Sequence, residues 1–196
     1  MKRQSYLLIF SIVMLLTSCQ TVGGPAGTPT GELPRPKIAL VLGGGAARGF
    51  AHVGVIRALE QEKIPIDLIV GTSVGSLIGA IYANDMNSME LEWTAFLLEK
   101  DNLFDYGMFT AFTGMGAAKG DKLEEFVKSK VPVANIENLK IPFAAVATDL
   151  NRGTRVVLDK GSVARAVRAS SAIPGVFPPV DHQGKMLVDG GVIDNI

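Results

Sequence analysis

Apolar residues along positions 37–83 fall into short blocks that predict alternating strands and helices. Residues 37–42 (KIALVL) and 66–70 (IDLIV) are apolar and rich in β-branched side chains, which is typical of buried strands. Between them, residues 50–63 (FAHVGVIRALEQEK) carry apolar positions at helical spacing, and a second helix is expected after the second strand, to about Ala83. The order strand, helix, strand, helix predicts a βαβ unit with a parallel core sheet.

The second half of the chain predicts further helices and an antiparallel hairpin. Three helices are expected, over residues 89–100, 122–130 and 162–172. Asp121, with Glu124 three residues later, is the expected N-cap of the second of these helices. Two strands, residues 142–150 and 154–159, flank a turn, and residues 184–191 (GKMLVDGG) predict a short strand that runs into a glycine turn.

The N-terminus departs from this globular pattern and is typical of a targeting segment. Two basic residues precede a short apolar run, residues 6–16, which is too short for a membrane-spanning helix. The following Leu-Thr-Ser-Cys, ending at Cys19, resembles the lipobox of bacterial lipoproteins. We therefore expect residues 1–18 to be a lipoprotein signal peptide and Cys19 to be lipidated. The alternative is an ordinary cleaved signal peptide with an incidental cysteine.

Lipidation at Cys19 would place the protein in the bacterial cell envelope. Gln20 follows the cysteine, and the resemblance to lipoproteins implies the outer membrane, because an Asp at this position is the inner-membrane signal. Residues 19–36 are dominated by Gly, Pro and Thr without an apolar period, which predicts a flexible tether between the lipid and the folded domain.

Composition narrows the possible partners and cofactors. The 196 residues suit one domain, and the 19 basic and 19 acidic residues give a formal net charge of +0, so no basic field favours nucleic acid. One cysteine excludes an internal disulfide framework, and one cysteine with two histidines argues against a Cys/His zinc site. No metal and no cofactor is expected.

Candidate chemistry begins where the second predicted strand meets its helix. There the sequence Gly71-Thr72-Ser73-Val74-Gly75 matches G-x-S-x-G, in which a serine is presented on a sharp turn and two glycines avoid clashes within it. A serine at a helix N-terminus also lies beside free backbone N–H groups that favour negative charge. The alternative is a small residue in a tight bend, since Gly and Ser are common in turns.

A glycine cluster follows the first predicted strand, in LGGGAARG. Its successive backbone amides are suited to hold an oxyanion. A dinucleotide-binding G-x-G-x-x-G misses by one residue whether it begins at Gly43 or at Gly44, and no Gly-Lys-Ser/Thr follows that would make a P-loop. Nucleotide binding therefore ranks last among the possible functions.

A nucleophilic serine also needs a base, and the chain offers three candidates. His52 lies on the first predicted helix, and His182 lies in a polar turn late in the chain, where a triad in the order Ser, acid, His would need it. Asp189 follows a predicted strand and precedes two glycines. Each histidine also has an ordinary packing or solvated interpretation, and an Asp-Gly pair is often only a turn.

Three motifs taken together resemble the patatin-like phospholipase family: LVLGGGAARGFAHVGVIRALE, GTSVG and VDGGVIDN. The resemblance covers Lys37 to the end and implies an α/β fold, a three-layer sandwich with a mainly parallel central sheet. It implies a Ser-Asp dyad with Ser73 as nucleophile and Asp189 as general base. Further members of the family pattern are the oxyanion loop and the glycines of the elbow: Gly44, Gly45, Ala46, Arg48, Gly49, Gly71 and Gly75.

Two positions depart from the family pattern. Ala46 stands where many members have a further glycine, and alanine resists positive φ. The sequence ends at Ile196, where family domains generally continue, so we expect residues 37–196 to be a patatin-like domain that is incomplete at its C-terminus.

The expected function is hydrolysis of lipid or phospholipid esters through an acyl-enzyme. Residues 104–115, rich in Phe and Met, are a candidate acyl-chain wall or lid, although ordinary core is the commoner use of such residues. Two other functions remain open: a non-catalytic lipoprotein that binds lipid or a partner, and a transacylase that uses the same dyad.

Overall fold

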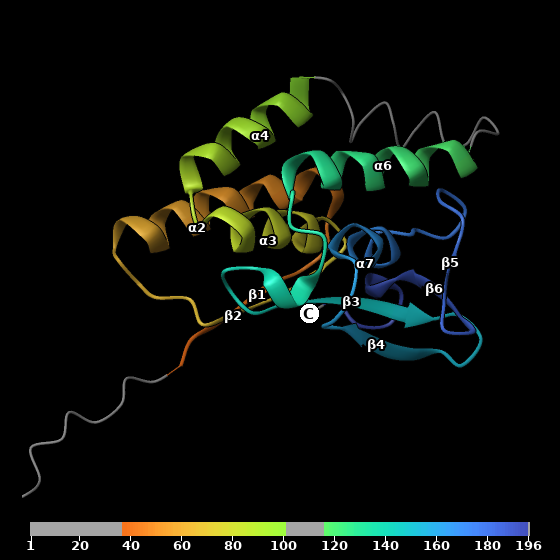
Figure 1. Cartoon of the computed structure of the whole chain (residues 1–196). Helices are drawn as coiled ribbons and strands as arrows, with labels where there is room; N and C mark the ends of the chain where they lie inside the picture. The colour runs from red at the N-terminus through yellow and green to blue at the C-terminus, as the bar shows by residue number, and fades with distance from the viewer. Residues whose placement is uncertain (1–36, 101–115, 196) are drawn as a thin grey trace, which may run out of the picture. The chain divides into compact units, whose positions relative to one another are not determined.

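A mixed six-stranded sheet carries the helices in the part of the chain that the computed structural model describes, residues 37–100 and 116–195 (Figure 1). The strands are β1 (Ala39–Leu42), β2 (Leu68–Thr72), β3 (Phe143–Asp149), β4 (Thr154–Leu158), β5 (Val180–His182) and β6 (Lys185–Asp189). The helices are α2 (Phe50–Gln61), α3 (Val74–Asp85), α4 (Ser88–Lys100), α6 (Gly116–Lys130) and α7 (Val163–Ser170). Three short 3-10 turns are η1 (Ala46–Gly49), η3 (Ile136–Asn138) and η4 (Gly190–Val192).

The predicted βαβ unit is confirmed. Strand β2 pairs in parallel with β1 on one side and with β3 on the other, and helix α2 connects β1 to β2. The predicted hairpin is also present, as the antiparallel pair β3 and β4. The α/β class with a parallel β1–β2–β3 core is therefore confirmed.

One predicted helix boundary is wrong. Asp121 does not cap a helix, because α6 already begins at Gly116 and Asp121 lies inside it. Nothing in Gly-Ala-Ala-Lys prevents a helix from extending that far. Asp121 instead forms an ion pair with α7: its Oδ1 lies 3.5 Å from Arg168 Nη1.

Strand β5 was not predicted, because its three residues show no usable apolar alternation.

Strands β2 and β6 share the same edge of β3, and this register positions the site. Strand β4 occupies one edge of β3 from Ala145 to Asp149. On the other edge, β2 pairs in parallel as far as Thr72 opposite Val146, and β6 pairs antiparallel from the opposite end as far as Asp189 opposite Ala147. The ends of β2 and β6 therefore meet head to head beside the middle of β3.

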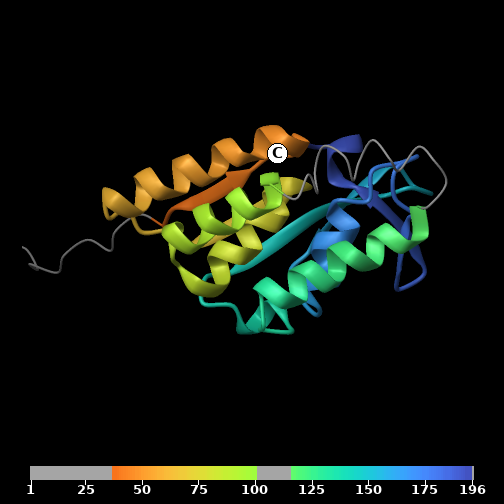
Figure 2. The same cartoon turned by 90° about the horizontal axis from the view of Figure 1, so that it is seen from above.

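The helices of the described residues lie over one face of this sheet, as Figures 1 and 2 show. The core between them contains Leu42, Ile69 and Leu77, each almost fully buried. On the opposite face of the sheet Val41 is 46% exposed and Val157 is 52% exposed. The alternation of buried and exposed residues along β1 is typical of a sheet with one solvated face.

Several predictions concern segments outside the described residues. These are the signal peptide (residues 1–18), Cys19 with the tether (19–36), and the Phe- and Met-rich segment 104–115. Within the described ranges, no helix has the length and apolar character needed to cross a bilayer.

Candidate active site

Ser73 lies at the turn between β2 and α3 in a strained backbone conformation. Its φ of 53° and ψ of −125° are unusual for a residue with a side chain. Such a conformation costs on the order of 1–3 kcal/mol and persists only where the surrounding structure enforces it. Ser73 is 7% exposed as a whole residue and precedes the first turn of α3, where backbone N–H groups lack intrahelical acceptors.

Two glycines allow the tight turn around Ser73. A Cβ on Gly71 would lie 2.5 Å from the carbonyl oxygen of Gly75, and a Cβ on Gly75 would lie 2.1 Å from the carbonyl oxygen of Leu42. Both distances are shorter than any real Cβ contact, so the backbones of β1, β2 and α3 can approach one another only with glycine at these positions.

The backbone of Ser73 is held by a residue that the sequence did not identify. Its N–H donates to Ser170 Oγ at 2.9 Å, and the Ser170 hydroxyl donates to the carbonyl oxygen of Val146 at 2.6 Å. Ser170 is fully buried at the end of α7, 97 residues away along the chain. The sequence could have pointed to Ser170 only as a polar residue on the apolar face of the helix predicted over residues 162–172.

Asp189 lies beside Ser73 because β2, which precedes Ser73, and β6, which ends at Asp189, pair with the same edge of β3. It ends β6 opposite Ala147, one residue beyond the Val146 position at which β2 pairs, so it lies level with Ser73. Gly190 then turns away against the end of β2, and a Cβ there would lie 3.0 Å from Thr72 Cγ2. The register thus brings together two residues that are 116 positions apart along the chain.

The environment of Asp189 favours its neutral form. Asp189 is 6% exposed as a whole residue, and burial raises the pKa of its carboxyl group above the usual value. The Ser73 hydroxyl and the Gly191 N–H, which donates to Oδ1 at 2.7 Å, oppose the burial and lower the pKa. The buried Oδ2 has no hydrogen-bond partner of standard geometry in the described residues. A free acceptor beside a serine hydroxyl is suited to receive its proton.

The glycine loop after β1 lies against Ser73. A Cβ on Gly44 would lie 3.1 Å from Ser73 Cβ, so this glycine is in close contact with the elbow. The N–H groups of Gly45 and Ala46 have no hydrogen-bond acceptor among the described residues. Ala46 has a φ of 49°, so it adopts the left-handed conformation that alanine resists.

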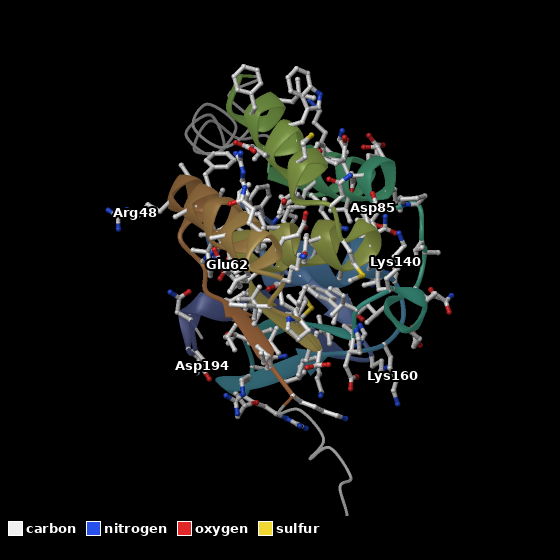
Figure 3. The ribbon with its side chains drawn as sticks, turned by 90° about the vertical axis from the view of Figure 1, so that its left-hand side faces the viewer. Arg48, Glu62, Asp85, Lys140, Lys160 and Asp194 are labelled. Carbon is white, nitrogen blue, oxygen red and sulfur yellow. The ribbon has the colours of Figure 1, made fainter. Side chains whose placement is uncertain are left out.

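Two other residues of the predicted oxyanion loop have different surroundings. Arg48 is exposed, its side chain extends away from the ribbon in Figure 3, and its N–H donates to the carbonyl oxygen of Gly45. Gly49 is buried, and a Cβ there would lie 2.4 Å from Val74 Cγ1. Arg48 and Gly49 therefore hold the loop and pack it on α3, whereas Gly45 and Ala46 present free amides.

A family model described as patatin-like phospholipase matches residues 40–196, a range that includes the glycine loop, the Ser73 elbow and Asp189. The chain belongs to the patatin-like phospholipase family. Two relatives with similar sequences carry NTE in their names. An uncharacterized NTE family protein of Mycobacterium tuberculosis is 38% identical over 161 residues, which cover 81% of this chain and 44% of that protein. The lysophospholipase nte1 of Aspergillus fumigatus is 37% identical over 161 residues, which cover 81% of this chain and 11% of that protein.

This patatin-like chain therefore spans less than half the length of these relatives.

Solved structures share its fold at low sequence identity. The crystal structure of VipD from Legionella pneumophila matches with a TM-score of 0.59 and 18% identity, over 82% of this chain and 47% of that one. ExoU, from the type III secretion system of Pseudomonas aeruginosa, matches with a TM-score of 0.52 and 17% identity, over 73% of this chain and 39% of that one.

The two histidines of this patatin-like chain lie elsewhere than at the Ser73 hydroxyl. His52 Nε2 is 2.8 Å from the carbonyl oxygen of Gly43, so His52 supports the glycine loop. His182 pairs with Lys185 at the far end of the β5–β6 hairpin. Asp189 is four residues beyond Lys185, about 13 Å along a strand. The geometry therefore offers Asp189, and neither histidine, as the group beside Ser73.

No cluster of metal-ligating side chains occurs in residues 37–100 and 116–195, where no three His, Cys, Asp or Glu side chains come together. The polar groups that contact Ser73 include the hydroxyls of Ser170 and Ser76, which bond its N–H and its carbonyl oxygen, and the carboxyl group of Asp189. Such a set can transfer an acyl group and a proton.

Proposed function

We propose that this protein is a serine acyl hydrolase for lipid esters, of the phospholipase A or lysophospholipase type. The observation that carries the proposal is the meeting of Ser73, on a strained turn, with the buried carboxyl group of Asp189 at the shared edge of β3. The lipid class comes from the family and from the relative named as a lysophospholipase.

In the first half of the reaction, Ser73 Oγ attacks the ester carbonyl carbon while its proton passes to Asp189. Collapse of the tetrahedral intermediate breaks the bond to the alcohol oxygen, which leaves with a proton from Asp189. In the second half, Asp189 takes a proton from water as the water oxygen attacks the acyl carbon. Collapse of this second intermediate breaks the bond to Ser73 Oγ, which takes the proton back from Asp189, and the fatty acid is released. The raised pKa makes Asp189 a stronger base than an ordinary aspartate, as a carboxylate acting alone requires.

Negative charge on the carbonyl oxygen needs donors, and the glycine loop supplies candidates. The N–H groups of Gly45 and Ala46 are free among the described residues, and the loop contacts the elbow through Gly44. The positive end of α3 lies at the same place, because Ser73 is its N-cap. Each such donor contributes about 10²- to 10³-fold to turnover in enzymes that use an oxyanion hole.

The direct test compares the wild-type chain with Ser73→Ala and Asp189→Ala on p-nitrophenyl acyl esters and lysophospholipids. We expect loss of the fluorophosphonate label with the first variant, and turnover reduced about 10²- to 10⁴-fold with the second. Ser129→Ala and Asp159→Ala, at exposed positions, are the matched controls and should retain full activity. Unchanged turnover in Ser73→Ala would remove this serine from the mechanism.

Two alternatives share this geometry. A non-catalytic lipoprotein that binds lipid or a partner would fold normally but never be labelled at Ser73. A transacylase would pass the acyl group from Ser73 to an alcohol or lysolipid, so product analysis with and without an added acceptor distinguishes it from a hydrolase. The buried Oδ2 of Asp189, which has no hydrogen bond of standard geometry in the described residues, favours chemistry over binding alone, because an unsatisfied buried carboxyl oxygen is costly in a purely structural role.

We also propose that the enzyme acts at the bacterial envelope, anchored through lipidated Cys19, with the outer membrane as its expected location. Support comes from the sequence around Cys19 and from the lipid class of the proposed substrate. The chain segment between Cys19 and Lys37 would then link the site to the lipid surface.

A further inference from the structure

Asn195 contacts the glycine loop although it lies 151 residues further along the chain. The Gly44 N–H donates to Asn195 Oδ1 at 2.9 Å, and Asn195 Nδ2 donates to the carbonyl oxygen of Gly44 at 3.4 Å. One carboxamide therefore engages both polar groups of a single glycine. None of the mechanistic roles described above uses Asn195.

The carboxamide lies where three parts of the site come together. A Cβ on Gly44 would lie 2.7 Å from Asn195 Oδ1 and 3.1 Å from Ser73 Cβ. On the other side, a Cβ on Gly191 would lie 3.2 Å from Asn195 Oδ1 and 3.1 Å from Asp189 Oδ1. Asn195 thus touches both glycines that adjoin the two residues of the dyad.

The segment that carries Asn195 is itself held in place. The N–H of Asp194 donates to the carbonyl oxygen of Gly190 at 2.9 Å, and the Asp194 carboxylate lies 2.6 Å from Arg155 Nη1 on β4. Figure 3 shows Asp194 and Arg48 on the same side of the molecule. The ion pair is partly exposed and so adds little stability, but with the backbone bond it fixes the direction from which Asn195 reaches Gly44.

This contact changes which amides are available in the loop. While Asn195 is in place, the Gly44 N–H already has an acceptor, so the next two amides of the loop, those of Gly45 and Ala46, are the ones left without an acceptor in the described residues. Ala46 holds a left-handed φ that its side chain opposes, so the loop needs support at a neighbouring residue to keep this conformation. A double hydrogen bond to Gly44 provides it.

We propose that Asn195 is a positioning residue that fixes Gly44, so that the Gly45 and Ala46 amides receive the oxyanion formed at Ser73. This role rests on the proposed acyl hydrolase function. The hydrogen bonds from Asn195 to Gly44 would stabilise the transition state in particular, because the position of the loop amides matters most when charge develops on the carbonyl oxygen of the ester.

The test uses Asn195→Ala and Asn195→Asp in the full chain. Asn195→Ala removes both hydrogen bonds, and we expect kcat to fall about 10- to 100-fold with KM changed less than about threefold. The rate of fluorophosphonate labelling at Ser73 should fall by a similar factor, since the phosphonate oxygen occupies the oxyanion position. Asn138→Ala, at an exposed position on η3, is the matched control and should have wild-type values.

Asn195→Asp keeps the acceptor for the Gly44 N–H, loses the donor, and adds negative charge near the reacting oxygen. We expect kcat to fall at least as far as in Asn195→Ala, and the acid limb of the pH profile to move to higher pH, because a second carboxylate opposes ionisation of Asp189. A merely structural contact would lower the melting temperature of Asn195→Ala without changing kcat or the pH profile.

The outcomes separate this proposal from the function on which it rests. A wild-type chain that neither turns over esters nor labels at Ser73 overturns the hydrolase function itself. A wild-type chain that does both, together with an Asn195→Ala variant of unchanged kcat and labelling rate, overturns only the positioning role. Circular dichroism and thermal melts establish that each variant is folded, and Asn195→Asp, nearly identical in shape, serves as the second readout if Asn195→Ala unfolds.

Discussion

At the scale of single residues, both members of the proposed dyad are held in unfavourable states. Ser73 adopts a backbone conformation that costs on the order of 1–3 kcal/mol, and Asp189 keeps a carboxyl group away from water with one oxygen unpartnered. The hydrogen bond from the Ser73 N–H to Ser170 Oγ and the bond from Gly191 to Asp189 offset part of these costs. Unfavourable groups of this kind cluster at functional sites, where a more stable residue would remove the chemistry.

Asp189 gives the first stability prediction. Its folded-state pKa is raised above the unfolded value, so it favours the folded protein below the unfolded pKa, and this contribution is lost as the pH rises through the folded pKa. Asp189→Asn cannot ionise and retains an oxygen for the Gly191 N–H. We expect this variant to melt at a higher temperature than the wild type at about pH 8, with a difference that shrinks toward about pH 4, while its turnover is lost.

Thermal melts followed by circular dichroism across this pH range measure the effect, with the exposed Asp159→Asn as control. A variant that is less stable than the wild type at every pH would mean that ionised Asp189 stabilises the fold, contrary to the burial argument. The same raised pKa predicts that turnover by the wild type falls on the acid side at a higher pH than an ordinary aspartate would give.

At the scale of elements, the site depends on how β2 and β6 share one edge of β3. Both strands end beside the middle of β3, β2 opposite Val146 and β6 opposite Ala147, and each then turns away: β2 into the Ser73 elbow and β6 into η4. Ala147 of β3, opposite Asp189, is fully buried. The head-to-head arrangement, rather than a long-range loop, sets how Ser73 and Asp189 lie relative to each other.

Gly190 tests this arrangement. A Cβ there would lie 2.4 Å from the carbonyl oxygen of Val146 and 3.0 Å from Thr72 Cγ2. We expect Gly190→Ala to push η4 away from β3 and Asp189 away from Ser73. Turnover should fall about 100-fold, and the free energy of unfolding should fall by about 1–3 kcal/mol.

Gly54→Ala is the control, since its Cβ in α2 would meet nothing within 4 Å. That variant should be more stable by about 0.5–1 kcal/mol, with unchanged turnover. Kinetics on a soluble ester and urea denaturation give both quantities. Full activity in Gly190→Ala would show that Asp189 does not need the close approach of η4 to β3.

The sequence predicted those parts of the site that depend on local patterns. Ser73 and Asp189 each lie at the end of an apolar strand and beside glycines, so the turn chemistry is visible in the sequence. Ser170 and Asn195 were missed, because their partners lie 97 and 151 residues away and only the tertiary fold brings them together. Periodicity predicts that a segment is a strand, but not which edge it joins.

At the scale of the whole molecule, the described site lies within one compact unit, residues Lys37–Ile196. The proposed lipid anchor, Cys19, lies outside the described residues and outside this unit. If anchor and catalytic unit are separate, the anchor contributes by keeping the enzyme near its substrate, through a raised effective concentration, and not by shaping the site.

Removing residues 1–36 tests this separation. The shortened chain should melt within about 2 °C of the wild type, because the core of Lys37–Ile196 is unchanged, and it should hydrolyse a water-soluble p-nitrophenyl ester at the wild-type rate. Its turnover of lysophospholipid in intact membranes should fall at least about tenfold, since the lipid surface no longer recruits it. Cys19→Ser in the full chain is the matched variant: it should lose metabolic labelling by palmitate and show the same selective loss on membranes. A shortened chain that also fails on the soluble ester would place the first 36 residues in the catalytic fold, because an anchor alone cannot change chemistry on a substrate that is free in solution.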